Sequence, residues 1–597
     1  MYTLEEKIVL NTIDELAAVD SAQIYYDEDI RGMREAIESL KRGEISEDEF
    51  KRYRLHRGIY GQRPDQKGFN MVRVKIPYGL LTSTQLMRIG EITRNFSDSI
   101  AHITTRQDIQ LHWVKLENVP SIMEKLAKVG LTTREACGNT VRNIVGSPLA
   151  GVSQNELFDI TPYARLLAKH LLRNQLNQHL PRKFKISFSG SADESDGIIP
   201  WIHDIGYVAA IQQEDGKVRK GFKVFVGGGL GGQPRVADVF EEFLPAELLI
   251  PNTEAIITVF NALGNRENRN KARMKYVLWK LGFEEFRRRV NVELSRILES
   301  GRTFPMPSDD VADDHLPVKT GFVLKANGDI EFNRWLESNV VSQKQAGYNV
   351  VYVNPVIGDI TADQLHTLGE LSERFSNGQV HTTTQQDIVL HWVRSSDVQW
   401  LYEKLKKANL DDAGAQDISN VTSCPGADTC NLGITHSRAL GKELTRLFHR
   451  QPDWSEILKD LRIKISGCQN SCGQHHVAAI GLHGATKKVN GGQIPSYIVS
   501  IGGGMNSGKH VFGKTLGRIP AHYATEAVSR ILRRFLSQRN PDENFWQFAE
   551  RIGIRSFRED IKDLSDFRPE NIKKELFVDL GEVSAFAAVT GEGECAA

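Results

Sequence analysis

The sequence predicts an α+β protein of mixed α/β lobes, in which one half-molecule occurs twice around a pseudo-two-fold axis. Two observations carry this prediction: a long internal repeat, and the same order of helix and strand patterns in each copy. Residues 102–114 recur as residues 381–393 at an offset of 279, with ten of 13 positions identical. A solenoid has units of about 20–50 residues, so a period this long indicates a duplicated half-molecule instead.

The repeat extends beyond its best-matched segment. Residues 183–187 correspond to residues 462–466 at the same offset. The glycine run at 226–229 corresponds to residues 501–504 at an offset of 275. We therefore expect a duplicated mixed α/β lobe to follow each copy.

Each copy begins with the same local patterns. Apolar and basic side chains alternate over residues 69–76, which is typical of a strand. Residues 83–96 have the apolar spacing of a helix, with Thr82 or Ser83 as the N-cap. Residues 100–114 are rich in β-branched side chains and predict two strands joined by a turn.

Residues 119–129 predict a second helix, with proline in its first turn, where proline is tolerated. The β-α-β-β-α order suggests half of a ferredoxin-like sandwich, and we expect the copies at 69–130 and 349–409 to pair. The expected organisation is an N-terminal helical arm at 1–60, ferredoxin-like half 1 at 61–135, a lobe at 136–315, ferredoxin-like half 2 with its linker at 316–420, a second lobe at 421–575, and a C-terminal tail at 576–597. From Gly581 onward the tail is small and polar, so we expect it to be loose.

Composition excludes several classes of protein. The 597 residues are 40% hydrophobic and 25% charged, with 75 basic and 75 acidic side chains. A balanced charge argues against a chain built to coat nucleic acid or an acidic membrane. No apolar run approaches the ~20 residues of a membrane helix, and the start lacks a secretory pattern. We expect a cytoplasmic protein with no nucleic-acid or membrane partner.

Four cysteines are the strongest chemical signal. They are spaced as Cys424-x5-Cys430 and Cys468-x3-Cys472. Two disulfides are improbable in a cytosolic chain. Structural zinc usually uses pairs two to four residues apart, which the first gap fits poorly. Four thiolates also suit a [4Fe–4S] cluster, which takes soft ligands.

These cysteines lie in segments that resemble a known family. Ser-Cys-Pro-Gly-Ala-Asp-Thr-Cys at 423–430 and Gly-Cys-Gln-Asn-Ser-Cys at 467–472 resemble the two signatures of the sirohaem nitrite/sulfite reductases. The resemblance spans about residues 58–560 and includes the duplication. Further matching segments are Gly58–Arg63, Met71–Pro77, Thr104–Asp108, Arg142–Asn143 and Pro181–Lys185.

The resemblance implies two cofactors, sirohaem and a [4Fe–4S] cluster, so that the two lobes would be sirohaem- and cluster-binding lobes. It implies that Cys424, Cys430 and Cys468 hold the cluster alone, while Cys472 bridges the cluster and the sirohaem iron. The dissimilatory branch carries an inserted ferredoxin domain with extra cysteines. This chain has none to spare, so it resembles the assimilatory branch.

The activity implied is a six-electron reduction of sulfite to sulfide, or of nitrite to ammonium. Arg73, Arg142, Lys183 and Lys185 resemble the catalytic cations that bind the oxyanion. Arginine offers a planar fork to oxyanions and lysine a mobile point charge. Without the resemblance, two lysines on one face of a strand at 182–188 would be a solvated edge. Crowded cations should lower the pKa of the lysines.

Sirohaem also carries carboxylates, which need cations. Arg106 resembles the family's haem-carboxylate ligand, and His112 is a candidate neighbour. The repeat mate of His112 is His391, so a packed structural histidine is an equal alternative. The glycine runs at 226–232 and 501–508 lack the dinucleotide-binding form, and we expect tight turns near the haem. Arg142 corresponds to Val421 in the second copy, which favours one haem site at the pseudo-dyad.

Two features favour sulfite over nitrite. Plant-type nitrite reductases of the family tend to carry asparagine at the position of Lys185. Tyr60 and Cys137 match positions that some sulfite-reducing members join as a thioether, with a free core cysteine as the alternative. Many members reduce both anions, so the choice is one of preference.

No flavin or nicotinamide domain is evident, so electrons come from an external donor. The long N-terminal arm resembles the ferredoxin-dependent branch, with an NADPH-flavoprotein subunit as the alternative donor, and we expect a monomer. A non-catalytic [4Fe–4S] carrier or sensor is a different class of function, but it would not need the four cations. A cluster-based hydratase characteristically leaves one iron without a cysteine, which four cysteines disfavour.

Overall fold

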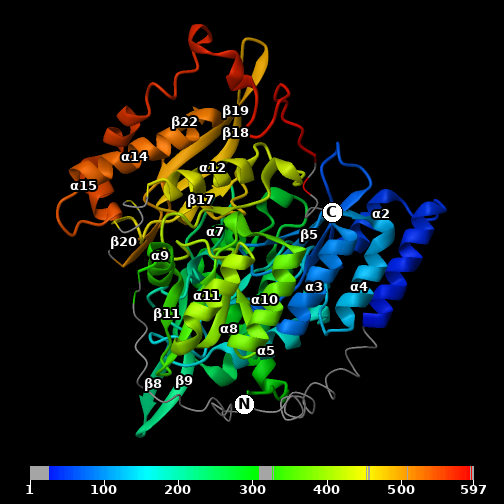
Figure 1. The fold of residues 1–597 in the computed structure, drawn as a ribbon. Coiled ribbons are helices and arrows are strands. Elements are labelled where there is room, and N and C mark those ends of the chain that lie inside the picture. Colours follow the sequence, from blue (N-terminus) through cyan, green and yellow to red (C-terminus); the bar gives the residue numbers. More distant parts are fainter. Residues whose placement is uncertain are drawn as a thin grey trace.

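A computed structural model describes residues 26–307, 326, 328–451, 454, 457–506, 508–591 and 593. At its centre lie two five-stranded sheets, one built mainly from each copy of the repeat (Figure 1). Residues 1–25 of the expected N-terminal arm lie outside the described part. The described arm consists of a helix over residues 26–41 and α2 (Glu47–Leu55). None of the described helices is long and apolar enough to cross a membrane.

The first sheet follows the element order expected from the sequence. Thr82 caps α3 through a capping box with Gln85, so the expected start of this helix is confirmed. The sheet order is β1 (Ile59–Gly61), β2 (Phe69–Val74), β5 (Ile109–Lys115), β4 (Ile100–Ile103) and β13 (Asp359–Thr361), with helices α3 (Ser83–Phe96) and α4 (Val119–Ala127).

The second sheet repeats this arrangement. Thr361 and Gln364 form the same capping box at the start of α10. The sheet order is β11 (Val340–Ser342), β12 (Tyr348–Val353), β15 (Ile388–Arg394), β14 (Gln379–Thr382) and β3 (Leu80–Thr82), with helices α9 (Ile330–Asn339), α10 (Ala362–Phe375) and α11 (Val398–Lys407).

The two halves exchange their edge strands. Strand β13 of the second copy pairs with β4, and β3 of the first copy pairs with β14. Ile360 lies opposite Ala101, and Leu81 lies opposite Val380. Because Leu81 corresponds to Ile360 in the repeat and Ala101 to Val380, the two contacts are equivalent. One continuous hydrophobic core contains buried residues from both copies. The expected pairing of the two ferredoxin-like halves is therefore confirmed.

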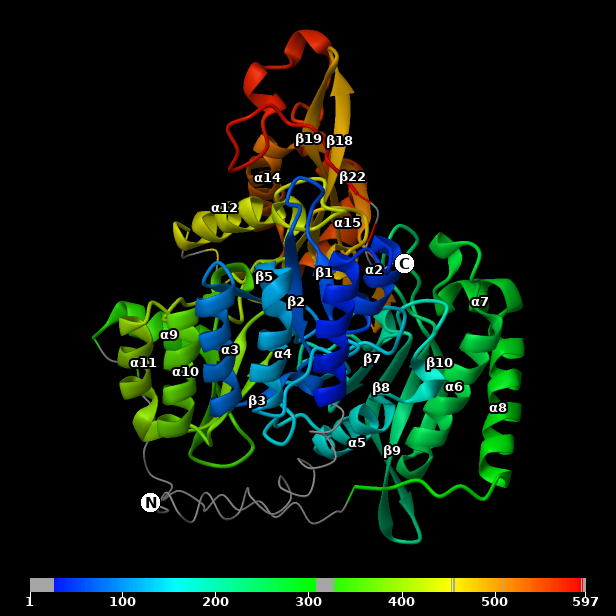
Figure 2. The same cartoon turned by 90° about the vertical axis from the view of Figure 1, so that its right-hand side faces the viewer.

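Helices α3 and α10 lie side by side across the pseudo-two-fold axis (Figures 1 and 2). A Cβ atom on Gly90 of α3 would lie 2.9 Å from the carbonyl oxygen of Ala362. A Cβ atom on Gly369, the repeat mate of Gly90, would overlap the side chain of Met87. Glycine at these two positions therefore permits the close approach of the helices.

Each half is followed by a lobe with its own hydrophobic core. In both lobes three parallel strands continue into two antiparallel strands, in the same order. The first lobe contains β6 (Val145–Gly146), β7 (Ile186–Ser189), β8 (Ile205–Glu214), β9 (Lys217–Val226) and β10 (Asp238–Pro245), with helices α5 (Thr161–Leu171), α6 (Leu249–Leu263), α7 (Met274–Leu281) and α8 (Phe283–Glu299).

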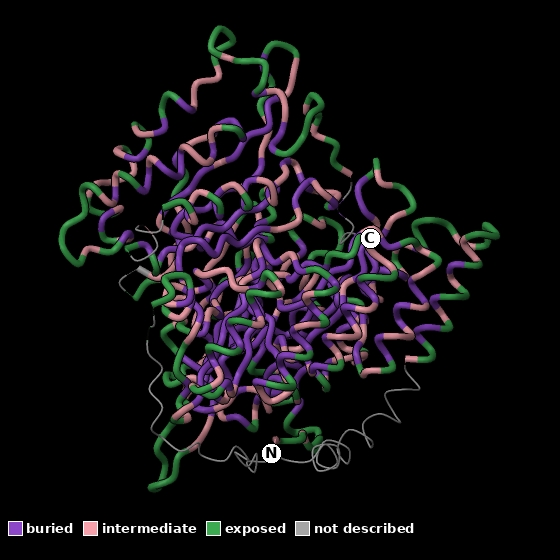
Figure 3. Tube along the Cα trace, viewed as in Figure 1, coloured by how far each residue is buried: buried purple, intermediate pink, exposed green. Residues whose placement is uncertain are grey.

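The second lobe contains β16 (Thr422–Ser423), β17 (Ile463–Ser466), β18 (Ile480–Val489), β19 (Gly492–Ile501) and β22 (Lys514–Pro520), with helices α12 (Ser437–His449), α14 (Ala524–Gln538) and α15 (Phe545–Asp560) and a small hairpin of β20 (Gly504–Asn506) and β21 (Lys509–Val511). The buried trace is concentrated along the sheets, while the hairpin tips and outer turns are exposed (Figure 3). The predicted α+β, duplicated architecture is confirmed.

Two buried glutamines, Gln107 and Gln386, join the halves to the lobes. Gln107 donates from Nε2 to the carbonyl oxygens of Gly146, at 2.9 Å, and Thr382, at 2.8 Å, and its Oε1 accepts from the Gly146 amide at 2.9 Å. Its repeat mate Gln386 donates to the carbonyl oxygens of Ile103 and Ser423 and accepts from the Ser423 amide. Each side chain therefore ties its own turn to the opposite half and to the first strand of its own lobe.

The expectation of a loose C-terminal tail is wrong for its described residues. The carbonyl oxygen of Val589 accepts from Arg63 at 2.8 Å, and the amide of Gly591 donates to Asn431 at 2.9 Å. A Cβ atom on Gly591 would lie 3.1 Å from Pro64. The small side chains of this segment show no apolar pattern that would predict packing. They nevertheless let its backbone lie close to neighbouring segments and form hydrogen bonds with them.

The glutamine contacts predict a large effect on stability. Gln386→Leu should lower the free energy of unfolding by about 3 kcal/mol or more, because it leaves three buried backbone groups without partners. The measurement is urea denaturation followed by circular dichroism. Gln213→Leu, at an exposed position of β8, is the control and should change stability little. Equal stabilities for the two variants would contradict the assigned role.

Candidate active site

The four clustered cysteines meet at one edge of the second lobe. Cys424 directly follows β16, and Cys468 follows β17, its parallel neighbour. The carboxyl ends of parallel strands lie at the same sheet edge, which brings the two loops together. The amide of Gly467 donates to Sγ of Cys424 at 3.2 Å, and Nδ2 of Asn470 donates to Sγ of Cys468 at 3.4 Å.

Glycines let the backbone of these loops pack tightly. A Cβ atom on Gly467 would lie 2.5 Å from Cα of Gly426, and one on Gly433 would overlap the backbone of Gly426. A Cβ atom on Gly473 would overlap the carbonyl oxygen of Ile465. Glycine at these positions therefore permits close contacts between the protein segments that carry the cysteines.

The chemistry of the thiols fits a cationic centre larger than one ion. Burial, then the thiol of Cys472, raises the pKa of Cys424 to about 12, and the same two causes raise the pKa of Cys468. Thiolate ligands at this site therefore need a bound cation. Cys424, Cys430, Cys468 and Cys472 form no disulfide. Among the described residues, no group of three or more Cys, His, Asp or Glu side chains could hold a single metal ion. Four soft thiolate ligands are the set that a [4Fe–4S] cluster takes.

Cations of the first copy lie beside Cys472. Oγ1 of Thr105 donates to the carbonyl oxygen of Cys472 at 2.8 Å, which places the turn that carries Arg106 against this cysteine. Burial first, then Arg106 and Lys183, lowers the pKa of Lys185 well below its ordinary value, while Cys472 acts in the opposite direction. The expected crowding of cations is therefore present, although burial is the larger cause for Lys185.

The sequence placed Lys183 and Lys185 on a strand at 182–188, but β7 begins only at Ile186. Both lysines lie in the extended segment before it. The amide of Lys185 donates to Oδ2 of Asp204 at 2.8 Å, so a backbone contact to a side chain replaces the sheet ladder here.

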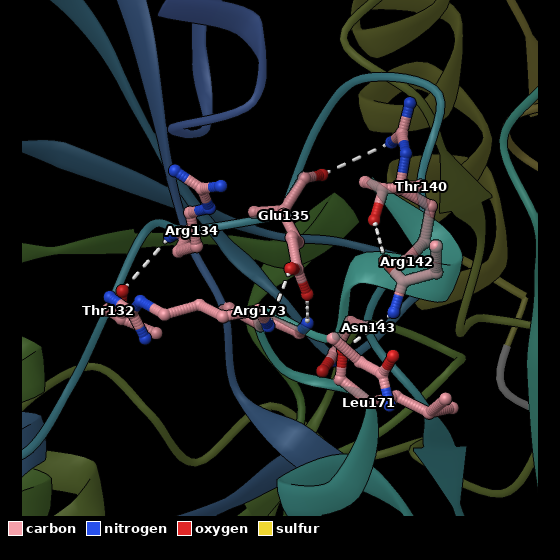
Figure 4. Close-up of polar contacts among 12 residues, drawn as sticks. Thr132, Arg134, Glu135, Thr140, Arg142, Asn143, Leu171 and Arg173 are labelled. Carbon is pink, nitrogen blue, oxygen red and sulfur yellow. Dashed lines mark hydrogen bonds and ion pairs between the residues drawn. The ribbon is translucent and has the colours of Figure 1, made fainter. Parts of the chain in front are cut away.

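Arg73 and Arg142 converge on the loop that follows the first ferredoxin-like half. Nη1 of Arg73 donates to the carbonyl oxygen of Ala136 at 3.2 Å, and Nη1 of Arg142 donates to the same oxygen at 3.1 Å. Nε of Arg142 donates to Gly138 at 2.9 Å (Figure 4 shows Arg142 on this loop). The two guanidinium groups are thus fixed by one turn of backbone.

Tyr60 and Cys137 belong to one small buried cluster with Leu55 and Met71. Nη2 of Arg142 donates to the hydroxyl oxygen of Tyr60 at 3.3 Å. Burial lowers the pKa of Arg73, but the combined effect of Cys137, Tyr60 and Asp108 raises it above the ordinary value. The candidate cross-link pair therefore lies beside both arginines.

Two further cations, Arg273 and Lys275, were not identified from the sequence; Arg273 lies near Lys185, and Lys275 lies near Arg273. Nη2 of Arg273 donates to Oδ2 of Asp204 at 2.8 Å. Nζ of Lys275 donates to the carbonyl oxygen of Leu230 at 2.9 Å, and burial, then Arg273, lowers the pKa of this lysine to about 7. The available signal was the density of basic residues over 265–280, which alone suggests a solvated surface.

Several buried N–H groups lack partners among the described residues, as expected where a polyanionic ligand binds. Arg106 donates from Nη2 to the carbonyl oxygen of Asn143, but its Nε has no partner. Nε of Arg273 is likewise buried without a partner. Guanidinium groups bind carboxylates through such N–H groups. Arg106 and Arg273 therefore fit the carboxylates of a sirohaem.

His112 is a buried residue of β5. Burial, then Arg438 and His102, lowers its pKa, and its Nδ1 is buried without a partner in the described structure. Its repeat mate His391 stacks on His381 at 4.3 Å and hydrogen-bonds the carbonyl oxygen of Pro148. His391 is therefore structural, while His112 keeps an unused polar atom.

The first glycine run forms a tight turn, as expected. Gly227 and Gly231 have φ angles of 88° and 103°, which only glycine adopts readily. A Cβ atom on Gly232 would lie 3.3 Å from the side chain of Gln469, which follows Cys468. The run therefore lies against a cysteine loop of the other lobe.

Two protein families match this chain, each in both copies of the repeat. The family described as "Nitrite and sulphite reductase 4Fe-4S domain" matches residues 137–298 and 414–567. The family described as "Nitrite/Sulfite reductase ferredoxin-like half domain" matches residues 62–129 and 341–408. These matches confirm the family resemblance and the duplication that the sequence indicated.

Individual relatives are named for both anions. The chain is 28% identical to the assimilatory ferredoxin-dependent nitrite reductase of Haloferax mediterranei, over 88% of this chain and 90% of that protein. It is 29% identical to sulfite reductase (ferredoxin) 1 of Mycolicibacterium paratuberculosis, over 82% and 83%. The solved structure of the Mycobacterium tuberculosis NirA protein matches with a TM-score of 0.73 and 26% identity, over 86% of this chain and 92% of that chain. Similarity alone does not choose the substrate.

The close contact at Gly467 predicts a selective loss of the iron–sulfur centre. Gly467→Ala should strongly reduce iron and acid-labile sulfide per chain, because the added methyl displaces the Cys424 loop from the Cys468 loop. Gly328→Ala is the control, since a methyl there meets no atom within 4 Å. Both variants should fold, as judged by circular dichroism. A normal iron content in Gly467→Ala would show that the loops tolerate the displacement.

Proposed function

The chain belongs to the nitrite and sulphite reductase family, and we propose that it reduces sulfite to sulfide, with nitrite as a second substrate. The observation that carries the choice of sulfite is the second lysine, Lys185, which lies with Lys183, Arg106 and Arg273 beside Cys472. The runner-up is nitrite reduction to ammonium at the same site, which relatives named for nitrite favour.

The cofactors of this family are sirohaem and a [4Fe–4S] cluster, and we assign their ligands as follows. Cys424, Cys430 and Cys468 would hold the cluster, and Cys472 would hold both the cluster and the sirohaem iron. Sirohaem, when bound, supplies the iron that takes the substrate and delivers electrons to it. The residues that would bind its carboxylates are Arg106, His112, Arg273 and Lys275.

The remaining cations bind the substrate and supply protons. The guanidinium groups of Arg73 and Arg142 present donors to the oxygens of the anion. Lys183 and Lys185 bind the other oxygens. Because the pKa of Lys185 is depressed, its ammonium gives up a proton readily to an oxygen that leaves as water. Lys185 must be protonated to bind the anion. The bound anion favours the charged form of this side chain, whereas burial disfavours it.

Sulfite needs more hydrogen-bond and proton donors from these cations than nitrite does. Sulfite is the more highly charged oxyanion, and it has three oxygens to protonate and release. Lys183 serves fewer oxygens than sulfite presents, and Lys185 adds a charge-assisted partner. This match between donor count and oxygen count supports sulfite as the preferred substrate.

The same proposal includes a thioether between a ring carbon of Tyr60 and Sγ of Cys137, formed as two electrons and two protons pass to an oxidant such as dioxygen. It is supported by the place of both residues in one buried cluster beside Arg73. The purified protein should then be lighter than its sequence mass by two hydrogen atoms, and digestion should release a linked peptide. Alkylation of Cys137 in the unfolded active enzyme would show a free thiol instead.

We propose ferredoxin as the electron donor, docking on the basic segment at residues 265–280. This segment carries one carboxylate and six basic side chains, of which Arg266, Arg269, Lys271 and Lys280 are not assigned to sirohaem, whereas the whole chain is balanced. Trp279 is 48% exposed on it, and Lys271 and Lys280 are exposed. Complementary charge of this kind steers an acidic partner.

The segment also adjoins a cysteine loop. Nη2 of Arg269 donates to the carbonyl oxygen of Gly593 at 2.5 Å, and a Cβ atom on Gly593 would lie 2.7 Å from Leu432, two residues after Cys430. The described end of the chain lies between α2 and α7 (Figure 2). A donor on this segment would therefore be close to the cluster.

Lys185→Asn tests the substrate. Loss of one charge-assisted contact in a buried site costs on the order of 2–4 kcal/mol of transition-state stabilisation, a rate factor of about 30 to 10³. The kcat/KM for sulfite should fall by that factor, while nitrite is affected less and cofactor content stays normal. Both activities are measured with an artificial one-electron donor.

The control is Lys464→Asn, at the repeat-related lysine whose Nζ is bound to Gln474 at 2.7 Å. It should leave the ratio of sulfite to nitrite activity unchanged. Equal losses for both anions in Lys185→Asn would return the choice of substrate to even odds.

Charge reversal tests the donor surface. The double variant Lys271→Glu/Lys280→Glu should raise KM for ferredoxin about tenfold at low salt, with a smaller effect at high salt. Activity with the artificial donor should not change. The matched control is Lys487→Glu/Lys488→Glu, two exposed lysines on β18 at the far end of the second lobe (Figure 1). Equal changes in KM for the two double variants would refute a specific docking surface.

A further inference from the structure

A fully buried carboxylate, Glu135, lies in the loop that follows the first ferredoxin-like half and that also carries Arg142 (Figure 4). Its Oε1 accepts from the backbone amide of Arg173 at 2.8 Å and from Nε2 of Gln178 at 2.7 Å. Its Oε2 lies 3.3 Å from Nζ of Lys75. Both carboxylate oxygens are therefore used, and every partner is a donor.

The backbone at Glu135 is held in an uncommon conformation. Glu135 has a φ of 59°, and so does Arg173, whose amide it binds. Left-handed conformations of residues other than glycine persist only where the surroundings impose them. The amide of Glu135 also donates to the carbonyl oxygen of His56 at 2.7 Å. Side chain and backbone together fix this one residue from four directions.

The fixed residue sets the position of the next carbonyl groups. Ala136, directly after Glu135, accepts from both Arg73 and Arg142, and Gly138 accepts from Nε of Arg142. Lys75, which pairs with Glu135, lies two residues after Arg73 on the same strand segment. The ion pair therefore ties the segment that carries Arg73 to the loop that carries Arg142.

We propose that Glu135 is a positioning residue, which holds the carbonyl groups of Ala136 and Gly138 where they aim the guanidinium groups of Arg73 and Arg142 into the site. The proposal rests on the proposed function only in taking these two arginines as oxyanion ligands. Glu135 itself touches neither substrate nor cofactor. It affects the binding of sulfite or nitrite by setting the angle between the guanidinium groups of Arg73 and Arg142.

The test variant is Glu135→Gln, which keeps the shape of the side chain. The amide places an NH2 group against donors and removes the negative charge beside Lys75. KM for sulfite and for nitrite should rise about 10- to 100-fold, since a displacement of about 1 Å at a binding group has this effect. The dissociation constant of sulfite, read from the haem spectrum of the oxidised enzyme, should rise by the same factor. Cofactor content should remain normal.

Glu156→Gln is the matched control. The side chain of Glu156, in the first lobe, is 2% exposed. It pairs with Lys344 at 2.8 Å and accepts from the amide of Gly151, and it has no hydrogen bond or ion pair to Arg73 or Arg142 among the described residues. It should lower the thermal midpoint without changing KM or the sulfite dissociation constant. A Glu135→Gln enzyme that is less stable but binds sulfite normally would overturn the positioning role.

If Glu135→Gln does not fold, Gln178→Leu provides the second test. It removes one donor to Oε1 and leaves all charges in place, so KM should rise in the same direction by a smaller factor. An unchanged KM would overturn the proposal. Failure of the proposed function is distinguishable, because the unmodified enzyme would then reduce neither anion.

Discussion

The arrangement of this protein depends on two glutamine side chains that occupy equivalent places in the repeat. Gln107 and Gln386 each satisfy three backbone groups in two segments that are distant in the sequence. Buried backbone groups without partners are costly, so the two halves and the two lobes keep one relative position. Gln386 binds both backbone groups of Ser423, the residue before Cys424. The cysteine loop therefore begins at a point fixed by the ferredoxin-like half of its own copy, and the same side chain joins that half to the opposite one through Ile103.

Against this symmetric frame, the two copies have diverged in their chemistry. The first copy supplies the cations, and Thr105 at its turn binds the carbonyl group of Cys472 from the second copy. In the second copy, Lys464 is occupied by Gln474, whereas the ammonium of Lys185 has no hydrogen-bond partner among the described residues. Val421 stands where the first copy has Arg142. The proposed site therefore draws on both copies, and at the equivalent place in the second copy Lys464 is engaged by an internal hydrogen bond.

Periodicity and the repeat predicted the fold well, because the apolar pattern decides which elements form and the 279-residue offset decides that they form twice. Strand limits were less predictable. The ladder at Lys185 is replaced by a contact to Asp204, and nothing local to the lysine indicates this aspartate. The cysteines and the four cations were recognisable as motifs. Arg273 resembled a solvated helix residue, and Glu135 an ordinary loop acid, because their partners are distant in the sequence. The prediction of a loose C-terminal tail was wrong for its described residues, because side-chain composition does not reveal backbone hydrogen bonds.

The exchange of edge strands has a consequence for the ancestry of the chain. Leu81 pairs with Val380 and Ile360 with Ala101, so residue i of one copy meets residue j of the other, and j meets i. This reciprocity is the mark of an isologous contact in a symmetric homodimer whose subunits swap a strand. Fusion of two such subunits into one polypeptide preserves the contact and removes the requirement for identical sequences. Each former subunit could then lose what the other supplied, and the single asymmetric centre is the product of that freedom.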